Sequence, residues 1–266
     1  LAAAEQRTDV NFLYRPGRLS GSVYLDANDD GAIGSGDTLI ASVEVTLSNG
    51  SSTTTSGGPT PTYAFPGLAA GSYIVAAPVN VNGYLQSISP AAPNLAAGQQ
   101  VDNLDFLYIG ARLSGYAYVD ANNNGLKDTG ETVLSGVSIT GPGGATRTTD
   151  ANGFYSFKAL QAGSYSVSAQ PTTQGYALTT VSPLAPNVAA GATKTDVNFG
   201  YRPGAMSGYA YVDANRNSQK DAGEQVLPGV TITGPNGATQ VTDATGRYEF
   251  SALISGNYSV SAPASA

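Results

Sequence analysis

The sequence predicts an all-β protein built from tandem β-sandwich repeats, and three observations favour this fold class. A segment of roughly 93 residues occurs three times, beginning at Arg18, Arg112 and Ala205. Within each copy, short alternating segments are separated by turn residues at regular intervals. The composition combines Ser, Thr, Asn and Gly with Val, Tyr and Ala, which suits strands and turns and poorly suits helices.

The second copy shows the expected strands most clearly. Residues 113–119 alternate, which predicts Ala117 and Val119 on one face and Tyr116 and Tyr118 on the other. The further strand segments are SGVSITGP, ATRTTD, FYSFKAL, GSYSVSAQ, YALTTVSP and KTDVNFGY. About seven short strands per copy is the pattern of a small β-sandwich.

The alternation also predicts the core of each copy, because residues two apart on a strand share a face. The expected core residues are Tyr63, Phe65, Tyr73 and Val75 in copy one, Tyr155, Phe157, Tyr165, Val167 and Ala169 in copy two, and Tyr248, Phe250, Tyr258, Val260 and Ala262 in copy three.

The repeats divide the chain into domains with short joins. We assign residues 18–111, 112–204 and 205–266 to repeats 1, 2 and 3, and expect repeat 3 to lack its last two strands. Residues 1–17 match 188–204, so we expect the last strand of a preceding repeat, or a donor strand. The joins contain no flexible Gly/Ser linker, which favours restricted orientations and an elongated rod.

The extra strand expected at the N-terminus and the strands expected to be missing from repeat 3 leave two interpretations open. The chain can be a window from a longer array of repeats. Alternatively, its N-terminal strand completes repeat 3 of an identical chain by strand addition, which would build a self-assembling extracellular filament.

A loop rich in carboxylates and amides follows the first strand of each copy. In DANNNGLKDTGE (residues 120–131), side-chain oxygens fall at positions 1, 3, 5, 9 and 12, with Gly at position 6 and a main-chain carbonyl at position 7. This spacing matches a calcium-binding loop. The expected ligands are Asp120, Asn122, Asn124, Leu126, Asp128 and Glu131.

The other two copies repeat this loop with changes. Copy three offers Asp213, Asn215, Asn217, Gln219, Asp221 and Glu224, and copy one offers Asp26, Asn28, Asp30, Ala32 and Asp37. Ser218 replaces the Gly in copy three, whereas copy one has Gly34 at position 9 and the shorter Asp37 at position 12. We therefore expect the first site to be weaker or differently built. The alternative is an Asx-rich turn that binds only water.

The charge distribution favours the metal interpretation. The three loops hold ten of the 19 acidic residues, and a bound cation would relieve their mutual repulsion. Calcium accepts six to eight oxygens in flexible geometry, so it fits Asn-containing loops better than magnesium does.

Composition excludes several functional classes. The chain has no Cys and no His, which removes the thiol nucleophile, the imidazole base and the usual zinc ligands. We expect no enzyme. The net charge of −7 gives no basic footprint for nucleic acid, and no apolar run is long enough to span a membrane.

The stretch SGYAYVDANNNGLKDTGE, with LSGVSITGPGG and TTDANGFYSFKALQAGSYSVS downstream, resembles the B-type repeats of serine–aspartate (Sdr) surface adhesins of Gram-positive bacteria, relatives of the collagen-adhesin B domains. The resemblance covers all three copies. It implies Ig-like (prealbumin-like) sandwiches in an extracellular stalk, on the bacterial cell surface or in a secreted fibre. It also implies that calcium stiffens the stalk through the loop ligands named above.

The leading hypothesis is thus a calcium-stabilised stalk or fibre segment, a rigid spacer without catalysis. Its expected partners are calcium, neighbouring repeats or identical chains end to end, and a host or cell-surface ligand elsewhere in the full protein. The filament is one alternative. Another is a directly adhesive glycan- or protein-binding module, in which Tyr116, Tyr118, Tyr209 and Tyr211 stack on sugars instead of packing across strands.

Overall fold

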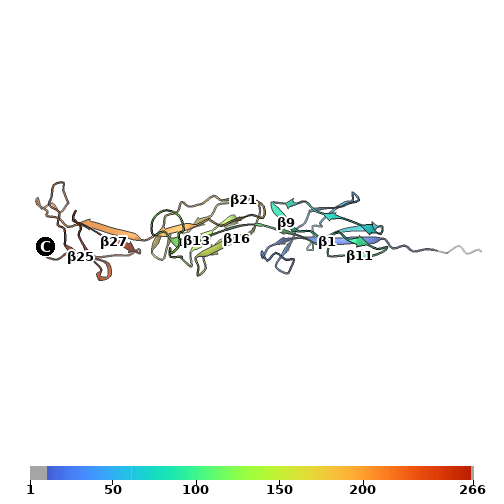
Figure 1. Ribbon diagram of the computed structural model, residues 1–266, viewed down its shortest axis with the longest axis horizontal. Helices are drawn as coiled ribbons and strands as arrows, with labels where there is room; N and C mark the ends of the chain where they lie inside the picture. The colour runs from blue at the N-terminus through green and yellow to red at the C-terminus, as the bar shows by residue number, and fades with distance from the viewer. Residues whose placement is uncertain (1–10, 61, 265–266) are drawn as a thin grey trace, which may run out of the picture. The chain divides into compact units, whose positions relative to one another are not determined.

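The computed structural model describes residues 11–60 and 62–264, and within them the regular structure consists of β-strands and two 3-10 turns (Figure 1). In this part of the chain no helix has the length and apolar character needed to cross a bilayer. The prediction of an all-β chain is confirmed.

The strands of repeat 1 are β1 (Gly17–Asp26), β2 (Thr38–Leu39), β3 (Glu44–Leu47), β4 (Ser52–Thr54), β5 (Thr62–Leu68), β6 (Gly71–Ser72), β7 (Val75–Ala76), β8 (Asn80–Val81), β9 (Tyr84–Ile88), β10 (Asn94–Leu95), β11 (Gln100–Val101) and β12 (Phe106–Ile109).

Repeat 2 contains β13 (Ala111–Val119), β14 (Ser138–Thr140), the 3-10 turn η1 (Pro142–Gly144), β15 (Thr146–Thr148), β16 (Phe154–Leu160), β17 (Gly163–Ser164), β18 (Ser168–Ala169), β19 (Thr172–Thr173), β20 (Tyr176–Leu178), β21 (Asn187–Val188), β22 (Thr193–Lys194) and β23 (Phe199–Arg202). Repeat 3 contains β24 (Gly204–Tyr209), β25 (Thr231–Thr233), the 3-10 turn η2 (Pro235–Gly237), β26 (Thr239–Val241) and β27 (Arg247–Leu253).

The chain divides into two compact units, and repeat 2 contributes to both. The first unit runs to Leu113 and includes Phe157–Ser164 and Asn187–Thr195. The second unit consists of Ser114–Ser156, Tyr165–Pro186 and the chain from Asp196 onward. The contacts described below lie within one unit or the other.

Strand β1 is the central element of repeat 1. It pairs in parallel with β11 and β12 and antiparallel with β2 and β5, and the sheet order is β11-β1-β12-β9-β8. A second sheet has the order β4-β3-β7. The hydrophobic core lies between the two sheets, with Leu19 and Phe106 from the first packed in one cluster with Val45 and Val75 from the second. Repeat 1 is therefore the β-sandwich that the alternation predicts.

Repeats 2 and 3 reuse this pairing scheme. In repeat 2 the sheets have the orders β16-β13-β23-β20-β19 and β15-β14-β18, with β22 also paired to β13. In repeat 3, β24 pairs with β27 and β25 pairs with β26. Among the described strands β24 has no parallel partner, whereas β1 and β13 pair in parallel with β12 and β23.

The parallel pairing explains the glycine after Ser in the first strands of repeats 1 and 2. A Cβ on Gly115 would lie 2.5 Å from the carbonyl carbon of Val197, so only glycine allows the two backbones to approach. The buried Tyr155 hydroxyl donates a hydrogen bond to the same Val197 carbonyl at 2.5 Å. In repeat 1 the equivalent bond runs from the Tyr63 hydroxyl to the carbonyl of Leu104.

The predicted core residues are buried to different degrees. Tyr63, Phe65, Val75, Tyr155, Phe157, Val167 and Phe250 are buried, whereas Tyr73, Tyr165, Ala169, Tyr248, Tyr258 and Val260 are partly exposed and Ala262 is exposed. The most exposed members come from repeat 3, whose described strands form only two-stranded sheets. A two-stranded sheet covers less apolar surface than a complete sandwich.

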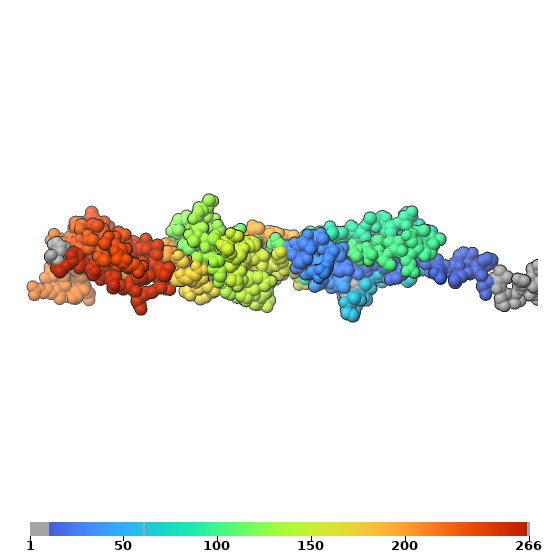
Figure 2. Space-filling model, turned by 90° about the horizontal axis from the view of Figure 1, so that it is seen from below, coloured from blue at the N-terminus to red at the C-terminus, as the bar shows by residue number. Residues whose placement is uncertain are grey.

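The segment before β1 belongs to no strand in its described part. The expected strand over residues 1–17 falls largely on residues 1–10, which lie outside the described residues. Residues 11–16 extend from repeat 1 as a narrow segment (Figure 2). Phe12, Leu13 and Tyr14 in this segment are 79%, 85% and 86% exposed.

Candidate metal-binding loops

A carboxylate at the end of each first strand curls the following loop back on itself. Asp120 is 1% exposed, and its two oxygens accept hydrogen bonds from the backbone N–H groups of Asn124 and Gly125, each at 3.1 Å. Its own N–H donates to the Tyr201 carbonyl of β23 at 2.8 Å, which holds the aspartate on the sheet. Position 1 of the loop is thus a rigid, buried acceptor.

The equivalent aspartates make the same contacts. Asp213 accepts from the N–H groups of Asn217 at 3.1 Å and Ser218 at 2.9 Å. Asp26, which is 2% exposed, accepts three backbone N–H groups, those of Asp29, Asp30 and Gly31, at 2.5, 3.1 and 2.9 Å. Each carboxylate thus supplies the hydrogen-bond acceptor for these loop N–H groups.

The loops turn through left-handed backbone conformations at positions 4 and 6. In the second loop these are Asn123 at φ 59° and Gly125 at φ 75°. In the third loop Ser218 adopts φ 62° where the second loop has glycine. The left-handed region costs a residue with a Cβ roughly 1–2 kcal/mol, so the third loop keeps this path against a local penalty.

Positions 3, 5 and 9 converge in the second and third loops. The side-chain amides of Asn122 and Asn124 donate to one oxygen of Asp128 at 2.7 and 2.6 Å, and these hydrogen bonds lower the pKa of Asp128 below its ordinary value. The side-chain oxygens (Oδ1) of Asn122 and Asn124 accept hydrogen bonds from the backbone N–H groups of Asn124 and Leu126, respectively.

The third loop repeats this arrangement. Asn215 and Asn217 both donate to Asp221 at 2.7 Å and lower its pKa. The side-chain oxygen (Oδ1) of Asn217 accepts a hydrogen bond from the backbone N–H of Gln219 at 2.8 Å. Two loops 93 positions apart therefore fold to one hydrogen-bond pattern, because their oxygen-bearing residues share one spacing.

The glutamate at position 12 closes each of these two loops. Glu131 accepts the N–H of Ala121 at 3.1 Å and that of Asp128 at 2.9 Å, so it joins both ends of the loop. Glu224 accepts the N–H groups of Ala214 and Asp221 at 3.0 and 2.9 Å.

The first loop is built differently, as its sequence predicts. Asp30 receives the side-chain amide of Asn28 at 2.8 Å and the N–H of Ala32 at 2.8 Å. Gly34 supplies no carboxylate at position 9 and instead donates its N–H to Oδ2 of Asp37 at 2.8 Å. Oδ1 of Asp37 is buried and has no hydrogen-bond partner in the described part of the chain.

The residues of all three loops fit a hard cation such as calcium. Their side-chain donors are oxygens of Asp, Asn and Glu, and the residues at position 7 add main-chain carbonyls. Within residues 11–60 and 62–264, no three Asp or Glu side chains form a metal cluster by themselves, which is expected because positions 3 and 5 are largely amides. Rotating an Asn carboxamide by half a turn about its Cβ–Cγ bond exchanges its nitrogen and its oxygen, so the same side chain can present an oxygen to a cation. The buried, unpartnered oxygen of Asp37 is an atom that a cation would neutralise.

Tyr118 packs beneath the second loop and is fully buried. Its hydroxyl has no hydrogen-bond partner among the described residues. Burial, with the nearby carboxylates of Asp120, Glu131 and Asp128, raises its pKa to about 12. The suggestion that Tyr118 stacks on sugars is wrong, because β13 is buried on both faces at this position.

Two other tyrosines form cation–π contacts with lysines of the loops. Lys127 Nζ lies 5.2 Å from the ring centroid of Tyr116, which also packs against Phe154 with ring centroids 5.4 Å apart. Lys220 Nζ lies 5.2 Å from the Tyr209 ring. These cation–π contacts hold loop position 8 against the first strand.

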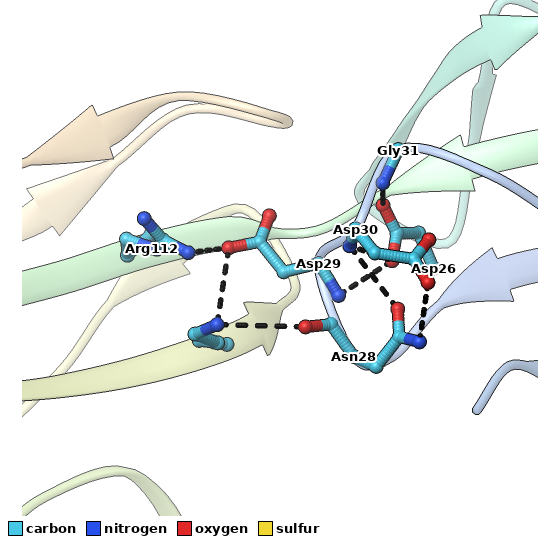
Figure 3. Close-up of polar contacts among 7 residues, drawn as sticks. Asp26, Asn28, Asp29, Asp30, Gly31 and Arg112 are labelled. Carbon is cyan, nitrogen blue, oxygen red and sulfur yellow. Dashed lines mark hydrogen bonds and ion pairs between the residues drawn. The ribbon is translucent and has the colours of Figure 1, made fainter.

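One functional contact escaped the sequence analysis. Asp29, at position 4 of the first loop, points away from Asp26 and towards repeat 2 (Figure 3). Its carboxylate forms ion pairs with Arg112 of β13 and, at 3.6 Å, with Lys158 of β16. Lys158 also donates to the carbonyl of Asn28 at 3.4 Å. The sequence offered one signal for this contact: among the three loops, only that of copy one carries an acidic residue at position 4.

Comparison with known proteins identifies the family. Residues 17–106, 111–198 and 204–266 each match the family model of the SdrD B-like domain. The chain belongs to the SdrD B-like domain family. This match confirms the resemblance predicted from the loop and strand motifs.

SdrD B-like relatives of this chain include serine-aspartate repeat-containing protein F of Staphylococcus epidermidis, 29% identical over 300 aligned positions that cover 96% of this chain and 17% of the relative. Serine-aspartate repeat-containing protein D of Staphylococcus aureus (strain Newman) is 32% identical over 172 positions, 56% of this chain and 13% of the relative. The chain therefore spans a small part of these relatives. Among solved structures, the Bacillus anthracis TIE protein aligns with a TM-score of 0.49 and 19% identity over 93% of this chain and 45% of that one.

We predict that replacing Asn122 and Asn124 by Ala raises the pKa of Asp128 towards the ordinary value of 3.8, because both hydrogen bonds to the ionised carboxylate are lost. In the unchanged protein the lowered pKa means that this contact stabilises the loop above pH 3.8 and is lost as the pH falls through the lowered pKa. The measurement is an NMR pH titration in chelator. Asp221 of the same chain is the internal control and keeps its low pKa; an unchanged Asp128 titration would contradict the assigned cause.

Proposed function

We propose that this chain is a calcium-stabilised structural stalk or fibre segment of a bacterial surface or secreted protein, acting as a spacer without catalysis. The observation that carries the proposal is the recurrence of one oxygen-lined loop at the end of the first strand of each repeat. A single regulatory site would need one loop, whereas a structural role explains why each repeat has its own.

The residues that would hold calcium are those predicted from the sequence, including Asp120, Asn122, Asn124, Asp128 and Glu131 in the second loop. When bound, calcium would supply positive charge among the carboxylates of each loop. A ligand that binds only the folded loops stabilises the fold by mass action. The aspartates at position 1 already hold loop N–H groups by hydrogen bonds, which lowers the ordering cost of binding.

The family supports the stalk and the extracellular location. The relatives are serine-aspartate repeat-containing proteins of staphylococci, and this chain corresponds to only a part of their length. We infer that the tip partner, cell attachment and adhesion of the whole protein belong to other segments. Direct adhesion through tyrosines is less favoured, because Tyr118 is buried and Tyr116 packs on Phe154.

The joins between repeats support a spacer. At the first join the N–H of Ala162 donates to the carbonyl of Gly83, in the turn between β8 and β9, at 2.9 Å. At the second join the N–H of Ser255 donates to the carbonyl of Gly175, in the turn between β19 and β20, at 2.8 Å. Each repeat thus makes a defined backbone contact with the next. Such contacts favour the restricted orientation on which the predicted rod depends.

The test of calcium binding is isothermal calorimetry and thermal melting of the full chain with calcium or chelator. We expect three ions per chain and a higher melting temperature with calcium, since each site adds about 2.7 kcal/mol at a hundred-fold excess over its Kd. Magnesium should give a smaller shift.

The matched variants assign each ion to a loop. Glu131→Gln, Glu224→Gln and Asp37→Asn should each remove or weaken one binding event. Asp150→Asn is the control, because Asp150 accepts the N–H groups of Asn152 and Phe154 in a turn outside the loops. Equal melting curves with calcium and chelator would refute the proposal.

A second candidate, a filament of identical chains joined by strand addition, is favoured by two complementary surfaces. Phe12 and Tyr14 are exposed, whereas Phe199 and Tyr201 at the matching positions of repeat 2 are fully buried in β23. Strand β24 has no parallel partner among the described strands, and a strand equivalent to β23 would pair there. An exposed apolar segment and an open edge of the same register can satisfy one another.

We predict for this second candidate that the full chain sediments as concentration-dependent polymers. Deleting residues 1–16, which leaves β1 intact, or replacing Phe12 and Tyr14 by Asp, should return the chain to monomers. Sedimentation velocity measures both. A monomeric full chain at every concentration, or polymers that survive both changes, would contradict strand addition.

A further inference from the structure

The two joins between repeats share a backbone contact but differ in charge. The Gly83–Ala162 and Gly175–Ser255 hydrogen bonds are equivalent, with lengths of 2.9 and 2.8 Å. The ion pairs of Asp29 with Arg112 and Lys158 occur at the first join. At the second join the three matching positions carry no charged residue, so the same ion pairs cannot form there.

The repeats show this difference position by position. Arg112 begins repeat 2, and Ala205 stands at the matching place in repeat 3. Lys158 in FYSFKAL corresponds to Ser251 in YEFSAL, and Asp29 at loop position 4 corresponds to Asn123. All three charges of the first join are therefore neutral at the second. Ala205 instead lines a groove there, together with Gly175 and Ile254.

The first loop is shaped to present Asp29. Asp29 has φ 64°, and its N–H donates a hydrogen bond to Asp26 at 2.5 Å. Position 4 is also not among the ligand positions of the loop, so its carboxylate is available for another role. Figure 3 shows the Asp29 side chain directed at Arg112 while Asp26 and Asp30 face the loop interior.

We propose that Asp29, Arg112 and Lys158 form an electrostatic clamp that locks repeat 1 onto repeat 2, and that the residue at loop position 4 determines whether a join is locked. The partner that the Arg112–Lys158 surface fits is an acidic loop of the preceding repeat. The join between repeats 2 and 3 lacks the clamp and is the more flexible of the two. The clamp goes beyond the stalk function and does not require calcium, since Asp29 stands at loop position 4, which is not a ligand position.

The energetics set the size of the effect. The side chains of Asp29 and Arg112 are each 33% exposed and that of Lys158 is 41% exposed, so water screens the pairs in part. Two cations on one carboxylate form a small network, which is worth more than an isolated surface pair. Salt at about 1 M shortens the screening length to roughly 3 Å and should weaken the clamp.

The test measures the distance distribution across each join in the full chain. The chain has no Cys, so introduced cysteines are the only sites for nitroxide labels. Ser52, Thr146 and Thr239 are exposed and occupy matching positions in β4, β15 and β26. The pair Ser52→Cys and Thr146→Cys reports the first join, and Thr146→Cys with Thr239→Cys reports the second, by double electron–electron resonance.

We expect a narrower distribution at the first join than at the second. Asp29→Asn keeps a residue that tolerates positive φ and removes only the charge. It should raise the population outside the main distance about two- to five-fold at the first join, leave the second unchanged, and be mimicked by high salt. An unchanged first join in Asp29→Asn would overturn the proposal.

The reciprocal variant transfers the clamp. Asn123→Asp with Ala205→Arg and Ser251→Lys should narrow the distribution at the second join, and high salt should reverse the narrowing. No narrowing would show that loop position 4 does not determine locking. Repeating both measurements with calcium and chelator separates the proposals, because the clamp predicts an effect of Asp29→Asn in chelator whether or not calcium binds.

Discussion

The carboxylate at the end of each first strand, buried in repeats 1 and 2 and partly exposed in repeat 3, is the interaction on which the rest of the structure depends. In repeat 2, Asp120 is held by the Tyr201 carbonyl and in turn holds two backbone N–H groups of its loop. This links the parallel pairing of β13 and β23 to the loop path. The loop path then places the amides and carboxylates at positions 3, 5, 9 and 12 around one centre. Without the strand-end acceptor, the acidic loop would be a solvated turn with repelling charges.

Repetition of this unit separates what the fold requires from what each repeat varies. The strand-end aspartate and the backbone contact between successive repeats recur at equivalent positions. Loop positions 4, 6 and 9 are among those that vary, and each of these changes has a local consequence: Ser218 adopts a left-handed conformation, Gly34 removes a carboxylate, and Asp29 turns to a neighbouring repeat. The same charge pattern bears on end-to-end assembly. Arg216, at loop position 4 of repeat 3, and Arg18, at the start of repeat 1, occupy the places of Asp29 and Arg112. If identical chains joined head to tail, these two positive charges would meet and repel each other.

Local signals account for what could be predicted from the sequence. The loop ligands follow from a spacing within twelve residues, and the hydrogen bonds of Asn122 and Asn124 to Asp128 realise that spacing. The strands follow from alternation. The burial of Tyr118 could not be read from alternation, because β13 is covered on both faces by segments distant in sequence. The Asp29 contacts depend on side chains 83 and 129 positions away, and no local pattern contains that information.

The central claim is that these loops are cation sites that stabilise each repeat, and a crystal structure grown in calcium tests it most directly. The account predicts an anomalous peak inside each loop, with the Asn122 and Asn124 carboxamides turned so that oxygen replaces nitrogen at the centre, and with Asp37 Oδ1 directed at the ion. Loops without a peak at saturating calcium, with both amides still donating to Asp128, would contradict it.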